Sequence, residues 1–181
     1  MAIDKSNTPT WMKVVIILVA LSFVAMLVPV VFGSLGVLGG SGTTDTAGDT
    51  DAIAGQYQPR VDAALAVMQG DPQNADAVAQ VGHSYYEWAV AVYEGGQAQA
   101  SIPLWMSAVS YYDKALAIRP DDDIVLGNKA FALYYGQGTD TTAALEAFIA
   151  AAADNADLAQ QVQMAEEMLA TLASAATTQT P

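Results

Sequence analysis

The sequence has no cysteine, one histidine and few basic residues. Without cysteine the chain forms no disulfide bond and no thiolate metal site, and cysteine usage does not indicate its redox compartment. The 6 Lys and Arg residues are outnumbered by 19 Asp and Glu, which gives a formal net charge of -13. The basic residues beyond Gly33 are Arg60, Lys114, Arg119 and Lys129. Because these four are scattered, the sequence predicts no nucleic-acid-binding surface.

The sequence also lacks the residue spacings of metal and catalytic sites. His83 is the only histidine, and neither His-x3-His nor Glu-x-x-His, two spacings of metal ligands on a helix, occurs in the sequence. A hydrogen-bonding role in a core or groove is therefore favoured for it. No cysteine nucleophile exists, and Ser84 and Ser107 lie in no motif of an activated hydroxyl. We expect no metal, no cofactor and no enzymatic activity.

An apolar run without any charge covers residues 14–32. Its 19 residues reach about 30 Å as a helix, so the run predicts a transmembrane helix. A cleaved signal peptide is less favoured, because the run is long and no Ala-x-Ala-like site follows it. Lys5 and Lys13 precede the run, whereas the first basic residue after it is Arg60. The positive-inside rule then places residues 1–13 in the cytoplasm and the domain outside.

Residues 33–55 are rich in Gly, Ser, Thr and Asp, and we expect a flexible tether. Their glycines do not form a phosphate-binding loop, because the Lys and the following helix of that motif are missing. Asp45, Asp49 and Asp51 do not form a calcium loop, because its alternating acids, its Gly and its distal Glu are missing.

Small and aromatic residues recur at helical spacing in the second half of the chain. Ala108, Tyr112 and Ala115 lie on one face of a predicted helix, and Pro120 ends it. A face of this kind favours a second helix packed closely against it. We expect Gly82, Ala115, Ala132 and Ala151 to make such close contacts.

The order of these residues resembles the tetratricopeptide repeat (TPR) family, including membrane-anchored bacterial members. In that family a first helix carries an apolar residue, Gly or Ala, and Tyr, and a second carries Ala-x3-aromatic before a closing Pro. The matching residues are Val81, Gly82, Tyr85, Ala108, Tyr112 and Ala115 in one repeat, and Phe131, Ala132, Tyr135, Ala144, Phe148 and Ala151 in the next. In the second repeat Ala156 stands in place of the closing Pro.

The resemblance implies an all-α protein, with an N-terminal transmembrane helix followed by an α-solenoid over residues 56–174. The solenoid would contain about two and a half TPR helical hairpins and a C-terminal capping helix, whose core face would carry Val162, Met168, Leu169 and Leu172. Residues 175–181 would form a disordered tail.

The resemblance also implies a groove that holds a peptide or a partner helix. The residues expected to face this groove are Asp76, Ala79, His83, Tyr86, Leu126, Lys129 and Leu133. Chaperone-binding members grip a carboxylate with several Lys, Arg and Asn, but Lys129 stands nearly alone here and Leu133 replaces an Asn. The mixed character of the groove instead favours an apolar or amphipathic segment.

The first repeat carries about 14 residues more than the second between its two conserved stretches, which predicts a longer hairpin over residues 86–107. Ser101 is the expected N-cap of its second arm. Trp88, Tyr93 and Trp105 lie on the added turns and are expected to bury against a partner.

Together, these features predict a membrane-anchored scaffold or adaptor that binds proteins. The alternative is a structural or assembly subunit of a membrane complex that docks through the hairpin. Bacterial assembly factors for cytochrome c maturation have a similar layout.

Overall fold

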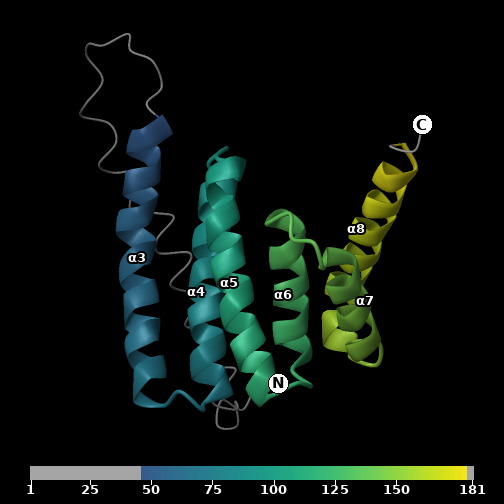
Figure 1. The fold of residues 1–181 in the computed structure, drawn as a ribbon, viewed down its shortest axis with the longest axis horizontal. Coiled ribbons are helices and arrows are strands. Elements are labelled where there is room, and N and C mark those ends of the chain that lie inside the picture. The colour runs from purple at the N-terminus through teal and green to yellow at the C-terminus, as the bar shows by residue number, and fades with distance from the viewer. Residues whose placement is uncertain (1–45, 179–181) are drawn as a thin grey trace, which may run out of the picture. The chain divides into compact units, whose positions relative to one another are not determined.

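The computed structural model describes residues 46–178, and every regular element within them is a helix. These residues belong to one compact unit. The elements are α3 (Thr46–Gly70), α4 (Ala75–Glu94), α5 (Ala98–Ile118), α6 (Asp123–Tyr135), α7 (Thr141–Ala151), a short 3-10 helix η1 (Ala156–Leu158) and α8 (Ala159–Thr178). Each helix packs against the next in chain order (Figure 1). The all-α prediction is confirmed for these residues. The predicted transmembrane helix (14–32), its preceding segment (1–13) and residues 33–45 of the predicted tether lie outside them.

Polar residues start several of these helices. The side chain of Asn74 accepts a hydrogen bond from the backbone N–H of Ala77 at 3.2 Å, and Asp122 accepts one from Val125 at 3.1 Å. Each bond satisfies a backbone donor that the first turn of a helix leaves free. The starts of α4 and α6 are therefore fixed by residues within one turn of the chain.

Helix α3 begins much earlier than the sequence pattern indicated. It starts at Thr46 and runs for 25 residues, so the prediction of a tether was wrong for residues 46–55. These residues run beside the long α4–α5 hairpin, and Ile53 lies near Gly95 at the turn that ends α4. Packing against that hairpin stabilises a stretch whose composition alone favours a loop.

The C-terminal helix is also longer than expected. Helix α8 continues to Thr178, so the prediction of disorder was wrong for residues 175–178. The four expected core residues, Val162, Met168, Leu169 and Leu172, do face the domain. Ala165 is fully buried beside them, although the sequence pattern did not single it out.

Three of the four small residues expected at close helix contacts are found there. Gly82 lies against Tyr112 of α5, and Ala115 and Ala132 are buried. The prediction for Ala151 was wrong, because it is exposed and Ala152 takes the buried position. The buried position at the end of α7 therefore comes one residue later than the repeat pattern predicts.

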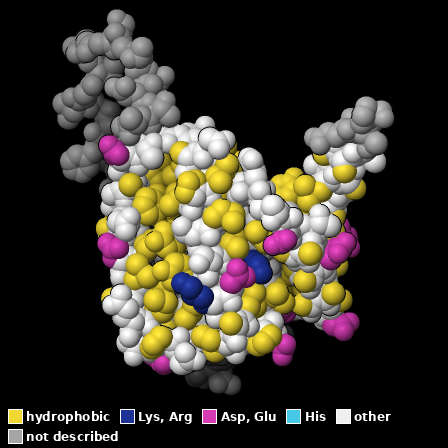
Figure 2. Space-filling view, in the orientation of Figure 1, with side chains coloured by type: hydrophobic (Ala, Val, Ile, Leu, Met, Phe, Trp, Pro, Cys, Tyr) yellow, Lys and Arg dark blue, Asp and Glu magenta, His cyan; other side chains and the backbone are white. Residues whose placement is uncertain are grey.

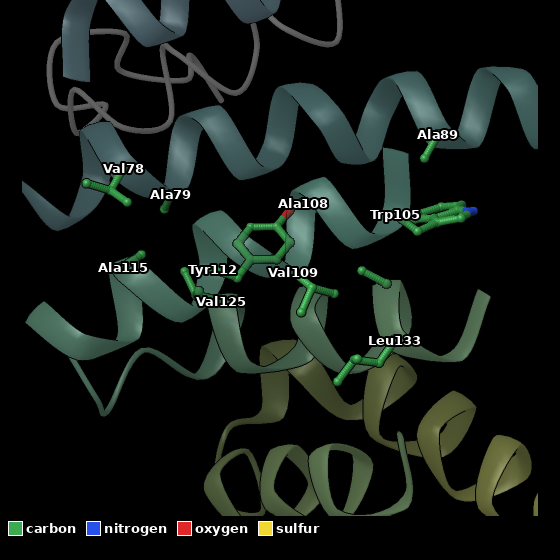
Figure 3. Close-up of a cluster of buried hydrophobic side chains, with 11 residues drawn as sticks. Val78, Ala79, Ala89, Trp105, Ala108, Val109, Tyr112, Ala115, Val125 and Leu133 are labelled. Carbon is green, nitrogen blue, oxygen red and sulfur yellow. The ribbon is translucent and has the colours of Figure 1, made fainter. Parts of the chain in front are cut away.

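The core consists of two clusters that meet at α6. The first joins α4, α5 and α6 and includes Ala79, Trp105, Ala108, Tyr112, Val125 and Leu133. Figure 3 shows Trp105, Val109 and Tyr112 spaced along α5, with Ala79 and Ala89 of α4 facing them. The second joins α6, α7 and α8 through Phe131, Leu145, Phe148, Leu158, Ala165 and Met168. Because α6 contributes to both clusters, it connects the α4–α5 hairpin to α7 and α8.

Candidate functional site

The residues of α4 that were expected to line a groove lie along its contact with α5 and α6. Asp76 is exposed and forms an ion pair with Arg119, which also contacts Asp122 at 3.4 Å. Ala79 is a core residue, whereas His83 and Tyr86 are half-buried. Of these four, Ala79 offers almost no surface to a partner.

His83 connects three helices by hydrogen bonds. Its Nδ1 atom lies 2.9 Å from the hydroxyl of Tyr112 and 3.5 Å from Nδ2 of Asn128. The tautomer in which Nδ1 accepts from both neighbours carries its proton on Nε2. Burial lowers the pKa of His83, and the carboxylate of Asp122 partly opposes this change. Burial also raises the pKa of Tyr112.

The second repeat is set in a different register from the one the sequence pattern indicated. A Cβ atom added at Gly127 would lie 2.7 Å from Cε2 of Phe148, which repeats the close contact of Gly82 with Tyr112. Gly127 precedes Ala132, the small residue of the predicted register, by five positions. Five residues rotate a helix face by about 140°. The signal that the sequence pattern missed was a glycine in the interior of a predicted helix.

This rotation changes which side of α6 each residue faces. Asn128 rather than Lys129 is the residue that reaches His83. Leu126, Lys129 and Leu133 instead turn toward α5 and α7. The seven residues expected in one groove are therefore divided between two sides of the domain.

The three α6 residues lie in a groove between α5 and α7, which we call the helix groove. It is lined by Met106, Val109 and Asp113 of α5, by Leu126, Lys129 and Leu133 of α6, by Asp140, and by Ala143, Ala144 and Ala147 of α7. Its volume is about 410 Å³. Nζ of Lys129 lies 2.6 Å from Oδ1 of Asp113. The groove therefore has an apolar lining with one internal ion pair.

The surface beside this groove is largely apolar. Figure 2 shows hydrophobic side chains over α3 and α5, and acidic side chains toward α7 and α8. Met106, a large hydrophobic residue that lines the groove, is 39% exposed.

The long hairpin uses most of its apolar side chains inside the fold. Trp105 is 1% exposed and its ring contacts those of Tyr86 and Tyr135, at centroid distances of 4.9 and 5.3 Å. Burial raises the pKa of Tyr86 to about 12, with a smaller contribution from Tyr135. The prediction that Trp105 buries against a partner was therefore wrong, because α4 and α6 already cover it.

Ser101 does not cap the second arm of the hairpin, contrary to the prediction. It lies inside α5 and is fully buried. Its hydroxyl donates to the backbone carbonyl of Ala98 at 2.7 Å and accepts from Nε1 of Trp105 at 3.0 Å. Gln97 occupies the N-cap position instead.

Trp88 belongs to a stack of three rings. It lies parallel to Tyr85 at 6.4 Å, and Tyr85 lies parallel to Tyr111 at 5.8 Å. Lys114 is 4.4 Å from the centroid of the Tyr111 ring. Nε1 of Trp88 is buried and has no hydrogen-bond partner among the described residues.

Tyr93 is the aromatic residue of the hairpin that stays on the surface. It is 42% exposed, and one edge of its ring packs against Tyr135 at 5.3 Å. Tyr135 in turn contacts Tyr134 at 5.4 Å. These three rings line a second cavity of about 590 Å³, which we call the aromatic pocket.

The aromatic pocket is completed by Ala98, by residues 137–139 of the turn after α6, by the start of α7 and by Leu172 of α8. Its other lining residues are Gln137, Gly138, Thr139, Thr141, Thr142 and Leu172. None of the described residues that line it is charged. Gly138 and Thr139 line the helix groove as well, so the turn separates the two cavities.

The described residues offer no group of three His, Asp or Glu side chains that could hold a metal ion. Within residues 46–178, none of the helices is both long and apolar enough to cross a bilayer. The chain matches no protein-family model and no curated protein with which it was compared. The functional conclusion therefore depends on the helix stack and its two cavities.

Proposed function

We propose that the chain is a membrane-anchored scaffold of the TPR-like solenoid class, and that its helix groove binds a partner helix. The observation that carries this proposal is the groove itself, in which two hairpins leave an apolar channel over α6. Grooves between packed helices are a recurring way to bind the apolar face of an amphipathic helix.

The dimensions of the groove suit about two turns of a helix. Met106 and Asp113, at its two ends on α5, are seven residues apart, which corresponds to about 10 Å along a helix axis. A partner helix covers this length with apolar residues at positions i, i+3 or i+4, and i+7. Ala143 and Ala147 on α7 have small side chains, so the partner backbone can approach closely.

The charge of the groove indicates which charged residues the polar face of the partner helix should carry. Asp113, Lys129 and Asp140 line it, which leaves one negative charge more than positive, and the whole chain carries -13. Because opposite charges accelerate association and select partners, we expect basic residues beside the apolar stripe. The occupant is therefore an amphipathic helix with a basic polar face.

A photo-crosslinking experiment tests the groove. A benzophenone amino acid replaces Met106 at the groove in the full-length protein in its membrane. The matched control replaces Met164, which is 46% exposed on α8 and outside the groove. We expect the Met106 position to capture a segment with an apolar stripe and basic flanks, and Lys129→Glu together with Ala143→Trp to abolish the capture. Equal capture at both positions, or capture of an acidic or extended segment, would contradict the proposal.

The proposed membrane placement is tested separately. Because the chain has no cysteine, one introduced cysteine is the only site for a maleimide reagent. We expect a membrane-impermeant maleimide to label Ser110→Cys, at an exposed position of α5, in intact cells. Ser6→Cys is expected to react only after the membrane is permeabilised. The reverse pattern would place the domain in the cytoplasm.

A second candidate function is that of a structural or assembly subunit of a membrane complex, for example of the cytochrome c maturation type. The exposed ring of Tyr93 at the hairpin is the observation that supports it. Tyr93→Lys would then move the chain to a smaller species on a native gel of solubilised membranes. Val67→Lys, at a position that is also exposed but lies on α3, is the control. Unchanged migration of the Tyr93 variant would exclude docking through this ring.

A further inference from the structure

The aromatic pocket has a chemistry different from that of the helix groove. Three tyrosine rings and several uncharged hydrogen-bonding groups line it, although the chain as a whole has 19 acidic and 6 basic residues. We propose that this pocket is a separate binding site for a neutral sugar of one or two rings.

The absence of charge in the lining selects the ligand class. A charged ligand would lose water without gaining a counter-charge from the described residues around it. A sugar presents flat C–H faces, which pack on aromatic rings, and hydroxyl groups, which exchange hydrogen bonds with amides and other hydroxyls. The pocket supplies both kinds of contact, through the rings of Tyr93 and Tyr134 and through the polar side chains of Gln137 and Thr142.

Tyr93 is placed to act as a stacking surface. Its ring is 42% exposed and is supported from one side by Tyr135, which itself stacks on the buried Trp105 at 5.3 Å with a tilt of 25°. A ring held in this way loses little conformational freedom when a ligand packs on it. The contact of Tyr135 with Trp105 also makes the indole a fluorescence reporter of the pocket.

The backbone of Gln137 places its side chain at the rim of the pocket, where α6 ends. With φ of 57°, it is the one residue other than glycine with a positive φ among residues 46–178. This conformation is strained for a residue with a Cβ atom and is most often filled by glycine. It belongs to the hydrogen-bonded end of α6, where the N–H of Gly138 donates to the carbonyl of Leu133 at 2.8 Å and the N–H of Gln137 donates to that of Tyr134 at 3.3 Å.

The glycines on either side of Gln137 are explained by sterics alone. A Cβ atom at Gly136 would lie 2.8 Å from the carbonyl oxygen of Ala132, and one at Gly138 would lie 2.4 Å from Cδ2 of Leu133. The turn therefore has glycine where space requires it but a glutamine where the backbone favours glycine. Packing does not explain this glutamine, because its side chain is exposed and lines the pocket. We attribute it to its amide, which can both donate and accept a hydrogen bond.

The volume of the pocket agrees with a ligand of this size. About 590 Å³ lies within the range of small-molecule sites, about 300–1,000 Å³. A peptide would be recognised mainly through its backbone or its terminal charges, for which the lining has no charged residue. A neutral peptide nevertheless serves as the competing class in the test.

The test measures binding to the full-length protein in a zwitterionic detergent, because maltoside detergents carry a disaccharide. The probes are maltose, cellobiose, lactose and diacetylchitobiose, with glucuronic acid and glucosamine as charged comparators and tetra-alanine amide, acetylated at its N-terminus, as the neutral peptide. Tryptophan fluorescence and calorimetry follow each titration. We expect saturable binding of at least one neutral disaccharide and none of the charged sugars or of the peptide.

Three variants then locate the site. Tyr93→Ala and Gln137→Gly are each expected to weaken binding about tenfold, which corresponds to the loss of one stacking or hydrogen-bonding contact. Gln137→Gly should also raise the melting temperature, because it removes the backbone strain while deleting the amide. Lys129→Met, in the helix groove, should leave sugar binding unchanged.

Several results would overturn the proposal. These are the failure of all four neutral disaccharides to bind, equal binding of the charged sugars, binding of the peptide in their place, and unchanged affinity in both pocket variants. Because the readout is sugar binding, none of these results depends on capture of a partner helix at the groove.

Discussion

The ring of Tyr112 lies against Gly82 so closely that a Cβ atom added at the glycine would be 2.6 Å from Cε1 of the ring. Tyr112 is fully buried, and its hydroxyl bonds to His83 in the next position of α4. Helices α4 and α5 are therefore in close contact where Gly82 meets Tyr112. The same arrangement recurs between Gly127 and Phe148 in the following hairpin.

Gly82→Ala should destabilise the domain. Tyr112 is fully buried and its ring would lie 2.6 Å from the added methyl group, so the substitution costs about 1–3 kcal/mol as overpacking. This cost exceeds the gain in helix propensity, which is at most about 1 kcal/mol. Urea denaturation of the detergent-solubilised chain measures the difference. A variant as stable as the original would show that the two helices are not in such close contact.

Gly55→Ala should have the opposite effect. Gly55 lies inside α3, and no atom stands within 4 Å of a Cβ atom added there. Replacing a glycine in a helix interior by alanine stabilises it by about 0.5–1 kcal/mol. The same denaturation experiment therefore distinguishes a helix that includes residue 55 from a flexible tether. An unchanged midpoint would support the tether.

Ser101→Ala should be costly and Trp105→Phe should relieve part of that cost. The alanine variant leaves Nε1 of the buried Trp105 without its acceptor, which costs about 1–3 kcal/mol. When both partners are removed, no unpaired donor remains. A double-mutant cycle followed by denaturant unfolding measures the coupling. Strictly additive effects would show that the hydrogen bond contributes nothing.

Stability should fall as the pH drops below about 7. The pKa of His83 is lower in the folded chain than its ordinary value of 6.5, mainly because of burial. Between these two values the unfolded chain binds a proton that the folded chain does not, so the unfolding free energy decreases as the pH falls through 6.5. The nearby charge of Asp122 limits the loss, and the other groups that face His83, Tyr112 and Asn128, are uncharged in this range.

His83→Gln provides the control for this pH dependence. Glutamine can accept from Tyr112 but does not titrate, so the variant should lose the part of the pH dependence that begins as the pH falls through 6.5. Denaturation midpoints at several pH values for both proteins give the comparison. Identical profiles would assign the dependence to other groups.

The elements that the sequence predicted well are those encoded by neighbouring residues. Asn74 and Asp122 fix the starts of α4 and α6 through hydrogen bonds within one turn of the chain. The spacing of Gly82, Tyr112 and Ala115 places the α4–α5 contact correctly, because each side chain keeps its face of the helix wherever the helix packs.

The errors arose where the decision depended on distant residues. The register of α6 depends on which small residue meets Phe148, and both Gly127 and Ala132 are small enough to suit a local pattern. The two cavities were not predicted, because each combines side chains from three or more helices. Gln137 gave no signal, since a positive φ at a residue other than glycine cannot be read from its neighbours.

The sequence by itself determined that this part of the chain is helical, where α4 and α6 begin, where α5 ends, and which small residues face a neighbour in the α4–α5 hairpin. Those features depend on interactions within one or two turns. Only the tertiary structure decided how far α3 extends, which side of α6 faces the groove, and that Trp105 is covered from within. Each of these outcomes depends on which surfaces become buried when the hairpins pack, and hydrophobic burial depends on area and not on sequence distance.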